Sequence, residues 1–163
     1  MAIDIFINLG DKIKGESQDK VQGPKGDADV LAWSWGMSQS GTTQMGGGGG
    51  AGKADFQDIS ISKYVDSATN GEMTALAKGT HIPKVILTIR KAGDGQHNYL
   101  VITMSEVIIT SLSTGGSGGE DRFTENLSLN FAKVDFSYYP QKADGTMGAA
   151  QDFKWNIATN SAD

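Results

Sequence analysis

The stretch that decides the fold runs from Phe123 to Tyr139 and reads FTENLSLNFAKVDFSYY. Its apolar residues occupy every second position, which is the period of a β-strand with one buried face. They stand at odd positions in the first half and at even positions in the second: Leu127, Leu129 and Phe131, then Val134, Phe136 and Tyr138. Since a shift of one residue turns every side chain over, we expect a bulge or a crossing between two sheets near Ala132-Lys133. A reversal of this kind lets a sheet curl into a barrel.

The same alternation recurs along most of the chain. Further strands are predicted at Ile3–Ile7, Asp29–Gln39, Asp55–Lys63, Val85–Ile89, Tyr99–Leu112 and Phe153–Ile157. In the second of these, the large residues that we expect on the buried side are Leu31, Trp33, Trp35 and Met37, opposite a small-residue outer face. In the long strand, the residues expected to share one side are Leu100, Ile102, Met104, Ile108 and Leu112. The link Ala92–Gln96 is typical of a hairpin turn.

Only Asp66–Lys78 favours a helix. Its apolar face is expected to hold Ala68, Met73, Leu76 and Ala77. Glu72 early and Lys78 late suit the helix dipole, while Asp66, Thr69 or Asn70 is expected to cap the start and Gly79 to end the helix. One helix beside about seven or eight strands predicts a mainly β protein. We expect a small closed or nearly closed antiparallel β-barrel with one appended α-helix, in a single domain over residues 1–163.

Composition excludes several classes of function. The 163 residues carry a formal charge of −5, so no basic surface is expected for nucleic acid or for insertion into an anionic membrane. The chain has no cysteine, which removes disulfides, thiolate nucleophiles and cysteine zinc sites. The N-terminus lacks a basic region and no apolar run approaches ~18 residues. We therefore expect a protein made in the cytoplasm without a cleaved signal peptide or a membrane-spanning helix.

The motifs that suggest catalysis are incomplete. Gly47 and Gly52-Lys53 have phosphate-loop spacing, but Ala54 replaces the magnesium-binding hydroxyl and a strand follows instead of a helix. His81 and His97 belong to no metal-binding pattern. We therefore expect no catalytic residue, no cofactor and no metal ion.

Five blocks of sequence, together with Trp155–Ile157, carry a resemblance to a known family. The blocks are Leu31–Gly41 (LAWSWGMSQSG), Met45–Lys53 (MGGGGGAGK), Leu87–Gly93 (LTIRKAG), Ser113–Arg122 (STGGSGGEDR) and Tyr139–Gly145 (YPQKADG). In this order they closely resemble the haemolysin-coregulated protein (Hcp) family, the tube subunit of bacterial type VI secretion systems, over essentially the whole chain. The turn Gln22–Asp27 and the helix start Asp66–Glu72 depart from the family pattern.

The resemblance implies a β-barrel that assembles as a hexameric ring. Such rings stack into a hollow tube inside a contractile sheath and its baseplate, capped by a spike protein of the VgrG family. Contraction expels the tube into a neighbouring cell, with small effectors in the lumen. A subunit of this kind is assembled in the cytoplasm and then secreted, and it requires self-complementary surfaces instead of catalytic residues.

The resemblance and the residues together give candidate sites. We expect a glycine-rich loop to reach a neighbouring subunit or the next ring, because glycine permits close backbone approach. The loop consists of Thr42, Thr43, Gln44, Met45, Gly46, Gly47, Gly48, Gly49, Gly50, Ala51, Gly52 and Lys53. The candidate lumen or effector-binding residues are Ser34 and Ser117. A charged turn, or interface ion pairs, is expected from Glu120, Asp121 and Arg122.

Three alternatives compete with this interpretation. A carbohydrate- or peptide-binding β-sandwich would present Trp33, Trp35 or Tyr138-Tyr139 as an exposed platform, although packing in a core or interface is favoured for the tryptophans. A phage tail-tube protein would share the logic of assembly. An enzyme using Asp121 or His97 is the third alternative.

Overall fold

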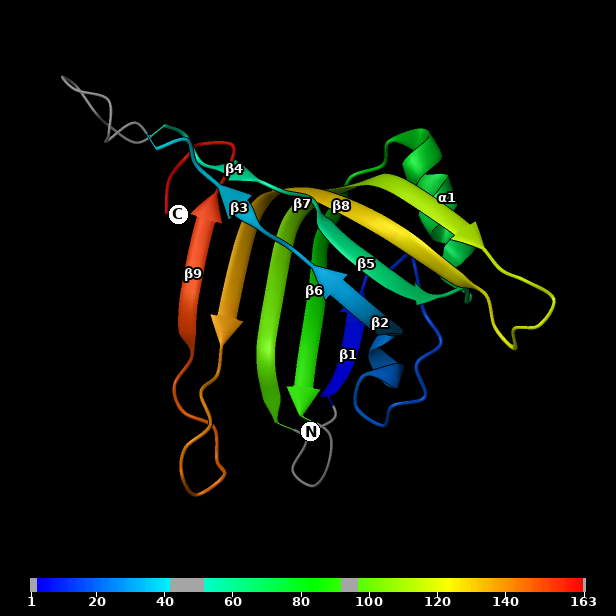
Figure 1. Cartoon of the computed structure of the whole chain (residues 1–163), viewed down its shortest axis with the longest axis horizontal. Helices are drawn as coiled ribbons and strands as arrows, with labels where there is room; N and C mark the ends of the chain where they lie inside the picture. Colours follow the sequence, from blue (N-terminus) through cyan, green and yellow to red (C-terminus); the bar gives the residue numbers. More distant parts are fainter. Residues whose placement is uncertain (1–2, 42–51, 92–96, 163) are drawn as a thin grey trace.

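The computed structural model describes residues 3–41, 52–91 and 97–162, which fold around an antiparallel β-barrel (Figure 1). The barrel wall consists of β1 (Ile3–Asn8), β2 (Ala28–Ser34), β5 (Ile59–Tyr64), β6 (Ile82–Lys91), β7 (Asn98–Gly115) and β8 (Thr124–Tyr138). Their order is β5-β2-β1-β6-β7-β8, and an additional pairing of β5 with β8 closes the wall. The expected closed antiparallel barrel with an appended helix is confirmed.

Three further strands lie outside this ring. The strand β9 (Gln151–Asn156) pairs with β8. A separate two-stranded ribbon is formed by β3 (Met37–Ser38) and β4 (Asp55–Phe56). A single turn of 3-10 helix, η1 (Gly23–Lys25), interrupts the long connection between β1 and β2.

The phase reversal predicted in β8 marks the place where this strand exchanges one neighbour for another. Leu127 and Leu129 pair with β5 and are buried in the barrel. Beyond Phe131 the same edge of β8 pairs with β9, and Val134 becomes the buried residue. The reversal therefore lets the first half of β8 form part of the closed barrel and the second half pair with β9 outside it (Figure 1).

A second reversal, in β7, was not expected. Met104 and Val107 are both buried, so the alternation changes phase between them, at Glu106. Glu106 has a φ of 54°, and the register places Pro83 of β6 opposite it. Proline has no N–H to donate, which interrupts the ladder at this point. The prediction that Ile108 shares the buried side was therefore wrong: Val107 and Ile109 are buried instead.

The prediction for residues 29–39 was also wrong in part. The strand ends at Ser34, and the pairing of β2 with β5 shifts register between Val30 and Ala32. This shift buries Val30 and leaves Leu31 exposed at 47%, while Met37, 46% exposed, lies on the separate strand β3. Strict alternation predicts that Leu31 is buried only if the strand is regular, and the register shift at this point breaks the alternation.

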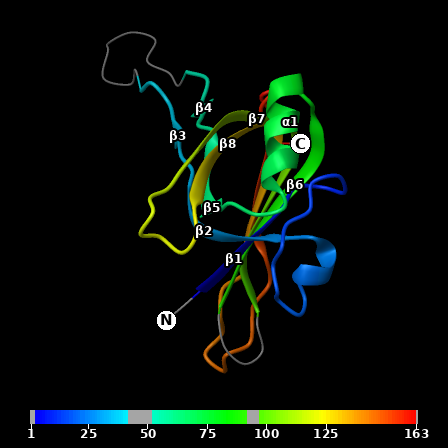
Figure 2. The same cartoon turned by 90° about the vertical axis from the view of Figure 1, so that its right-hand side faces the viewer.

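The helix α1 (Thr69–Lys78) packs beside β7 (Figure 2). It ends where predicted, at Gly79, whose φ of 64° suits a residue without a β-carbon. Its start is Ala68, which has no capping side chain; Asp66 accepts a hydrogen bond from the Ala68 N–H instead. No helix among the described residues is both long and apolar enough to cross a bilayer.

The orientation of α1 agrees with the prediction only in part: Ala68 is buried and Leu76 packs against the core as expected, whereas Ala77 is exposed. The side facing the protein carries Thr69, Glu72 and Ala75, while Met73 is exposed. Apolar periodicity alone does not identify the inner side of this helix, because the buried Glu72 lies on it.

Candidate functional site

Small polar residues form an outer face on four neighbouring strands, which we call the serine face. The register of β2, β5, β8 and β7 places Ser34 beside Ser60, Ser60 beside Ser128, and Ser128 beside Ser111. A second row runs from Ser62 through Asn126 to Ser113, and the Ser62 hydroxyl donates to Asn126 at 2.6 Å. Directly paired residues lie on one side of a sheet, so these hydroxyls form a continuous polar surface opposite the apolar interior.

Ser117 lies in a hollow at one border of the serine face. The hollow has a volume of about 510 Å³, and Ser113 and Asn126 line it as well. The structure therefore places Ser34 and Ser117 on one connected surface of hydroxyl and amide groups. Sequence analysis named these two residues but missed the serines on the strands between them, which only the register identifies.

The turn Glu120–Arg122 is exposed, and its charges find no partner of opposite charge within the described part of the chain. The guanidinium carbon of Arg122 lies 3.9 Å from the centre of the Tyr64 ring, which is a cation–π contact. The backbone N–H of Glu120 donates to the Ser117 carbonyl at 3.1 Å. The expectation of ion pairs with another subunit stays a prediction.

Residues 42–51 of the glycine-rich loop lie outside the described residues. The expectation that this loop reaches a neighbouring subunit or the next ring therefore also stays a prediction. Gly52 and Lys53 are exposed. The β3–β4 ribbon leads to this segment and extends beyond the barrel wall (Figure 1). Lys53 is followed by the strand β4, as expected when the phosphate-loop interpretation was rejected.

Aromatic rings pack on one another where the ribbon meets β8 and β9. The Trp35 ring stacks on Phe56 at 6.2 Å and on Phe136 at 6.0 Å between ring centres. Trp155 stacks on Phe56 at 6.5 Å and on Phe153 at 6.4 Å. The indole N–H of Trp35 donates to a backbone carbonyl. These rings stabilise the base of the ribbon, which disfavours an open platform for a sugar.

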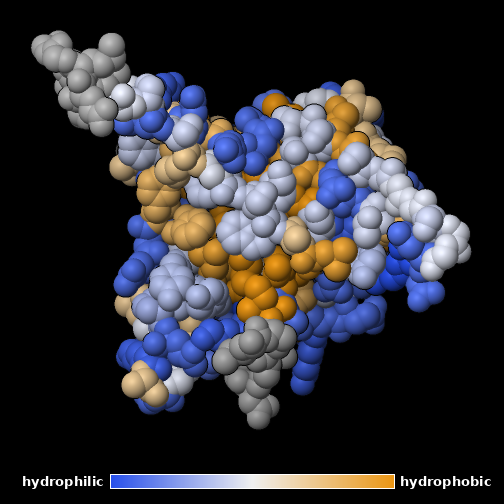
Figure 3. All heavy atoms as spheres, viewed as in Figure 1, coloured by the Kyte–Doolittle hydropathy of each residue, from blue (hydrophilic) through white to orange (hydrophobic). Residues whose placement is uncertain are grey.

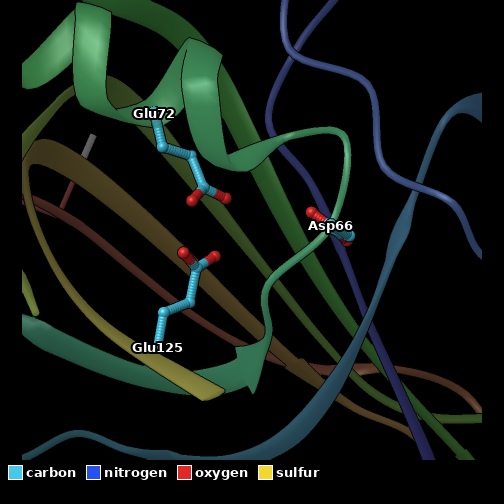
Figure 4. A group of neighbouring side chains, drawn as sticks. All are labelled: Asp66, Glu72 and Glu125. Carbon is cyan, nitrogen blue, oxygen red and sulfur yellow. The ribbon is translucent and has the colours of Figure 1, made fainter. Parts of the chain in front are cut away.

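A cluster of four charged residues, three of them buried and Asp66 half-buried, joins α1 to the barrel and was not predicted from the sequence. We define the charge cluster as Lys63, Asp66, Glu72 and Glu125. The Lys63 ammonium lies 2.5 Å from Glu125, 2.9 Å from Asp66 and 3.5 Å from Glu72, measured to the nearest carboxylate oxygen of each. Figure 4 shows the three carboxylates converging from α1, from the loop before it and from β8.

The signal for this cluster was present in the strand alternation. Lys63 follows Ile59 and Ile61 at an inward position, and Glu125 precedes Leu127 and Leu129 in the same way. An ionised residue at an inward position requires a partner. Lys63 and Glu125 are directly paired in the β5–β8 register, which supplies it.

The arrangement of the charge cluster is that of an ion network instead of an open metal site. Oxygen atoms of its three carboxylates lie within 4.8 Å of one another, close enough to share a cation. The Lys63 ammonium already contacts all three carboxylates and supplies that positive charge. Burial alone would lower the pKa of Lys63, but its hydrogen bonds to Glu125 and Asp66, together with the nearby carboxylate charges, outweigh burial and raise it. Lys63 is therefore an ammonium in the folded protein.

A second ion pair fastens the β1–β2 connection to the barrel. The guanidinium of Arg90 donates two hydrogen bonds to Asp19, and Asp4 lies 3.4 Å away. Asp19 also accepts hydrogen bonds from the backbone N–H groups of Val21 and Gln22. The hydrogen bonds from Arg90 and from these N–H groups hold the pKa of Asp19 well below its usual range.

The two histidines, His81 and His97, are exposed. In the described part of the chain neither belongs to a group of residues that could hold a metal ion.

Comparison with known proteins agrees with this architecture. Residues 6–138 match the family model for the type VI secretion system effector Hcp. The protein hcp1 of Pseudomonas aeruginosa is 57% identical over 162 residues, covering 98% of each chain. A solved type six secretion system protein superposes with a TM-score of 0.89 at 28% identity, over 98% of this chain and 99% of that one. Hcp1 from Salmonella typhimurium superposes with a TM-score of 0.80 at 30% identity over the whole of both chains.

The family match covers most of the barrel, including β5, β6, β7 and β8, and the 57% identity extends over nearly the whole chain. On these grounds the chain belongs to the Hcp family of type VI secretion proteins.

Proposed function

We propose that the protein is a structural subunit of the type VI secretion inner tube, built as a single domain that closes into hexameric rings and stacks them. The observation that supports assembly best is the set of large apolar side chains left exposed at separate edges of the chain. Leu31 and Met37 lie at the β2–β3 edge, Phe153 on β9, and Phe123, 54% exposed, before β8. Head-to-tail rings require complementary surfaces at different edges of one subunit.

The free edge of β9 gives a second reason. Among the described strands β9 pairs with β8 alone, and its other edge is covered only at its end, where Asn156 exchanges backbone hydrogen bonds with Ser161. An open edge beside an exposed phenylalanine is a surface that another chain can cover. Figure 3 shows apolar residues at the surface in the middle of the face viewed there.

The serine face is proposed as the lumen wall. Its exposed side chains are short and uncharged, so they offer weak hydrogen bonds to many ligands and strong ones to few. Ser34 and Ser117 are the proposed contacts to small effectors. The remaining partners, proposed from family membership, are a spike protein of the VgrG type, the contractile sheath and the baseplate.

The protein is proposed to act without catalysis. It is assembled in the cytoplasm, and contraction of the sheath then carries it to the medium or the target cell. Neither nucleic acid nor a membrane is a proposed partner, because the charge of −5 is unfavourable for both.

Assembly is tested by imaging the purified protein in negative stain and measuring its mass by light scattering. Annular particles viewed down one axis, with the mass of six chains, are expected. Single chains without annular particles at high protein concentration would refute the proposal.

The proposed surfaces are tested separately from assembly. Ser34→Gln and Ser117→Trp should reduce retention of co-expressed effectors and leave rings intact; loss of rings would instead assign these residues to packing. Protease should cleave the Thr42–Lys53 loop faster in free rings than in stacked tubes. Equal cleavage in both would contradict a role of this loop between rings.

A further inference from the structure

Two buried carboxyl groups face each other across the boundary between α1 and the barrel. Glu72 comes from α1 and Glu125 from β8, and Figure 4 shows their carboxyl groups pointing at one another. Both side chains are fully buried. Within the described residues, neither oxygen of Glu72 accepts a hydrogen bond, and the same holds for Oε2 of Glu125. If both carboxylates were ionised, burying them face to face with these oxygens unpaired would strongly destabilise the folded protein.

The charges in the cluster do not balance if every carboxyl group is ionised. Lys63 supplies one positive charge against the three carboxylates of Asp66, Glu72 and Glu125. The ammonium donates hydrogen bonds to Asp66 and Glu125, whereas Glu72 remains at 3.5 Å. Glu72 is therefore the carboxylate whose negative charge Lys63 neutralises least. Protonation of Glu72 would remove this charge and would also supply a hydrogen-bond donor toward Glu125.

We propose that Glu72 is a neutral carboxylic acid at neutral pH, that it donates its proton in a hydrogen bond to Glu125, and that this shared proton holds α1 against the barrel. Loss of the proton loosens α1. This makes the attachment of the helix sensitive to pH through a group that is fully enclosed in the folded chain.

The remaining charged groups around the cluster favour the same protonation state. Asp66, from the loop before α1, adds negative charge that opposes ionisation of Glu72. On the outer side, Asp66 lines a small pocket of about 230 Å³ together with Glu16, Asp29 and Arg122. These side chains contribute two further negative charges and one positive charge, so the pocket does not supply the missing positive charge.

The direction of the pH effect follows from proton linkage. Burial, reinforced by the hydrogen bond to Glu125, raises the pKa of Glu72 from 4.5 to about 8. When α1 opens, Glu72 meets water and its pKa returns to the ordinary value. Between these two values the closed form binds one more proton than the open form, so rising pH favours opening. The opening equilibrium should increase about tenfold per pH unit across this window and level off above it.

The experiment measures hydrogen exchange of the α1 amides as a function of pH in the full-length protein and in Glu72→Gln. Glutamine has the shape of the protonated acid and donates to Glu125 at every pH. The ratio of exchange rates, wild type over Glu72→Gln, should rise about tenfold per pH unit from mild acid to about pH 8, since the intrinsic pH dependence of exchange cancels. Glu120→Gln, which changes an exposed glutamate, should keep the wild-type profile. A ratio that does not change with pH would overturn the proposal.

A second measurement does not depend on the variant being stable. Infrared spectroscopy of the wild-type protein at neutral pH should show the carbonyl band of a protonated, buried carboxylic acid, and this band should disappear in alkali. Glu120→Gln should retain the band. If the wild-type protein has no such band at neutral pH, Glu72 is ionised and the proposal is wrong, whether or not rings assemble.

Discussion

Replacing Lys63 by methionine tests whether the charge cluster holds the fold together. Methionine keeps an unbranched apolar side chain of similar length, so the packing around the stem changes little. What the substitution removes is the ammonium, with its hydrogen bonds to the Tyr64 carbonyl at 3.0 Å, to Asp66 at 2.9 Å and to Glu125 at 2.5 Å. The three carboxyl groups of the cluster then remain buried without a cation.

The expected loss is large because one partner of a buried pair is removed and the other stays. Such changes cost about 3–5 kcal/mol of unfolding free energy. For a chain of this size that is a fall of about 6–20 °C in Tm. The loss should be greatest in mild alkali and should shrink as the pH falls toward about 5, because the folded variant can neutralise its uncompensated carboxyl groups with protons that the folded wild-type protein does not bind.

The assay is urea unfolding at several pH values, at one fixed protein concentration so that assembly contributes equally. Lys154→Met is the matched control, since Lys154 is 56% exposed and lies 4.0 Å from Asp135. It should cost less than about 1 kcal/mol. If Lys63→Met is no less stable than this control at pH about 8, the charge cluster does not contribute in the way we argue.

Two further substitutions test other contacts. Asp19→Asn should cost about 1.5–3 kcal/mol at neutral pH because it weakens two hydrogen bonds from the buried Arg90. The pKa of Asp19 is lowered in the folded state, so its stabilisation is present above the ordinary value of 3.8 and is lost as the pH falls below it. Unfolding curves of variant and wild type should therefore converge in acid, and a gap that persists there would contradict the ion pair. Gly15→Ala should cost about 1–3 kcal/mol, because a β-carbon at this position would lie 2.6 Å from the Ala28 backbone. Gly118→Ala, where a β-carbon meets nothing within 4 Å, should be nearly neutral; equal effects of the two in thermal unfolding would contradict the close packing.

Features that depend only on residues close together in the sequence were predictable. The alternation in β8 predicted a phase reversal near Ala132, and the reversal is where β8 passes from β5 to β9. The end of α1 at Gly79 follows from the conformational freedom of glycine. The predictions failed where a strand is irregular, as at Glu106 and between Val30 and Ala32, because such points depend on the neighbouring strand.

The candidate surfaces were predictable only in part. Ser34 and Ser117 were named singly, but the serines that connect them lie on three other strands and are assigned by the register alone. The glycine-rich loop was evident from composition, and its role between rings stays a prediction.

By itself, the sequence determined a β-barrel with one helix and its membership in the Hcp family, because strand period, turn chemistry and the five blocks that resemble the family are properties of contiguous residues. Tertiary structure alone decided that Lys63 and Glu125, 62 positions apart, would meet Glu72 of the helix. The physical reason is that a buried charge is stabilised by whichever groups the register brings within a few ångströms, and register is set by the packing of the whole barrel.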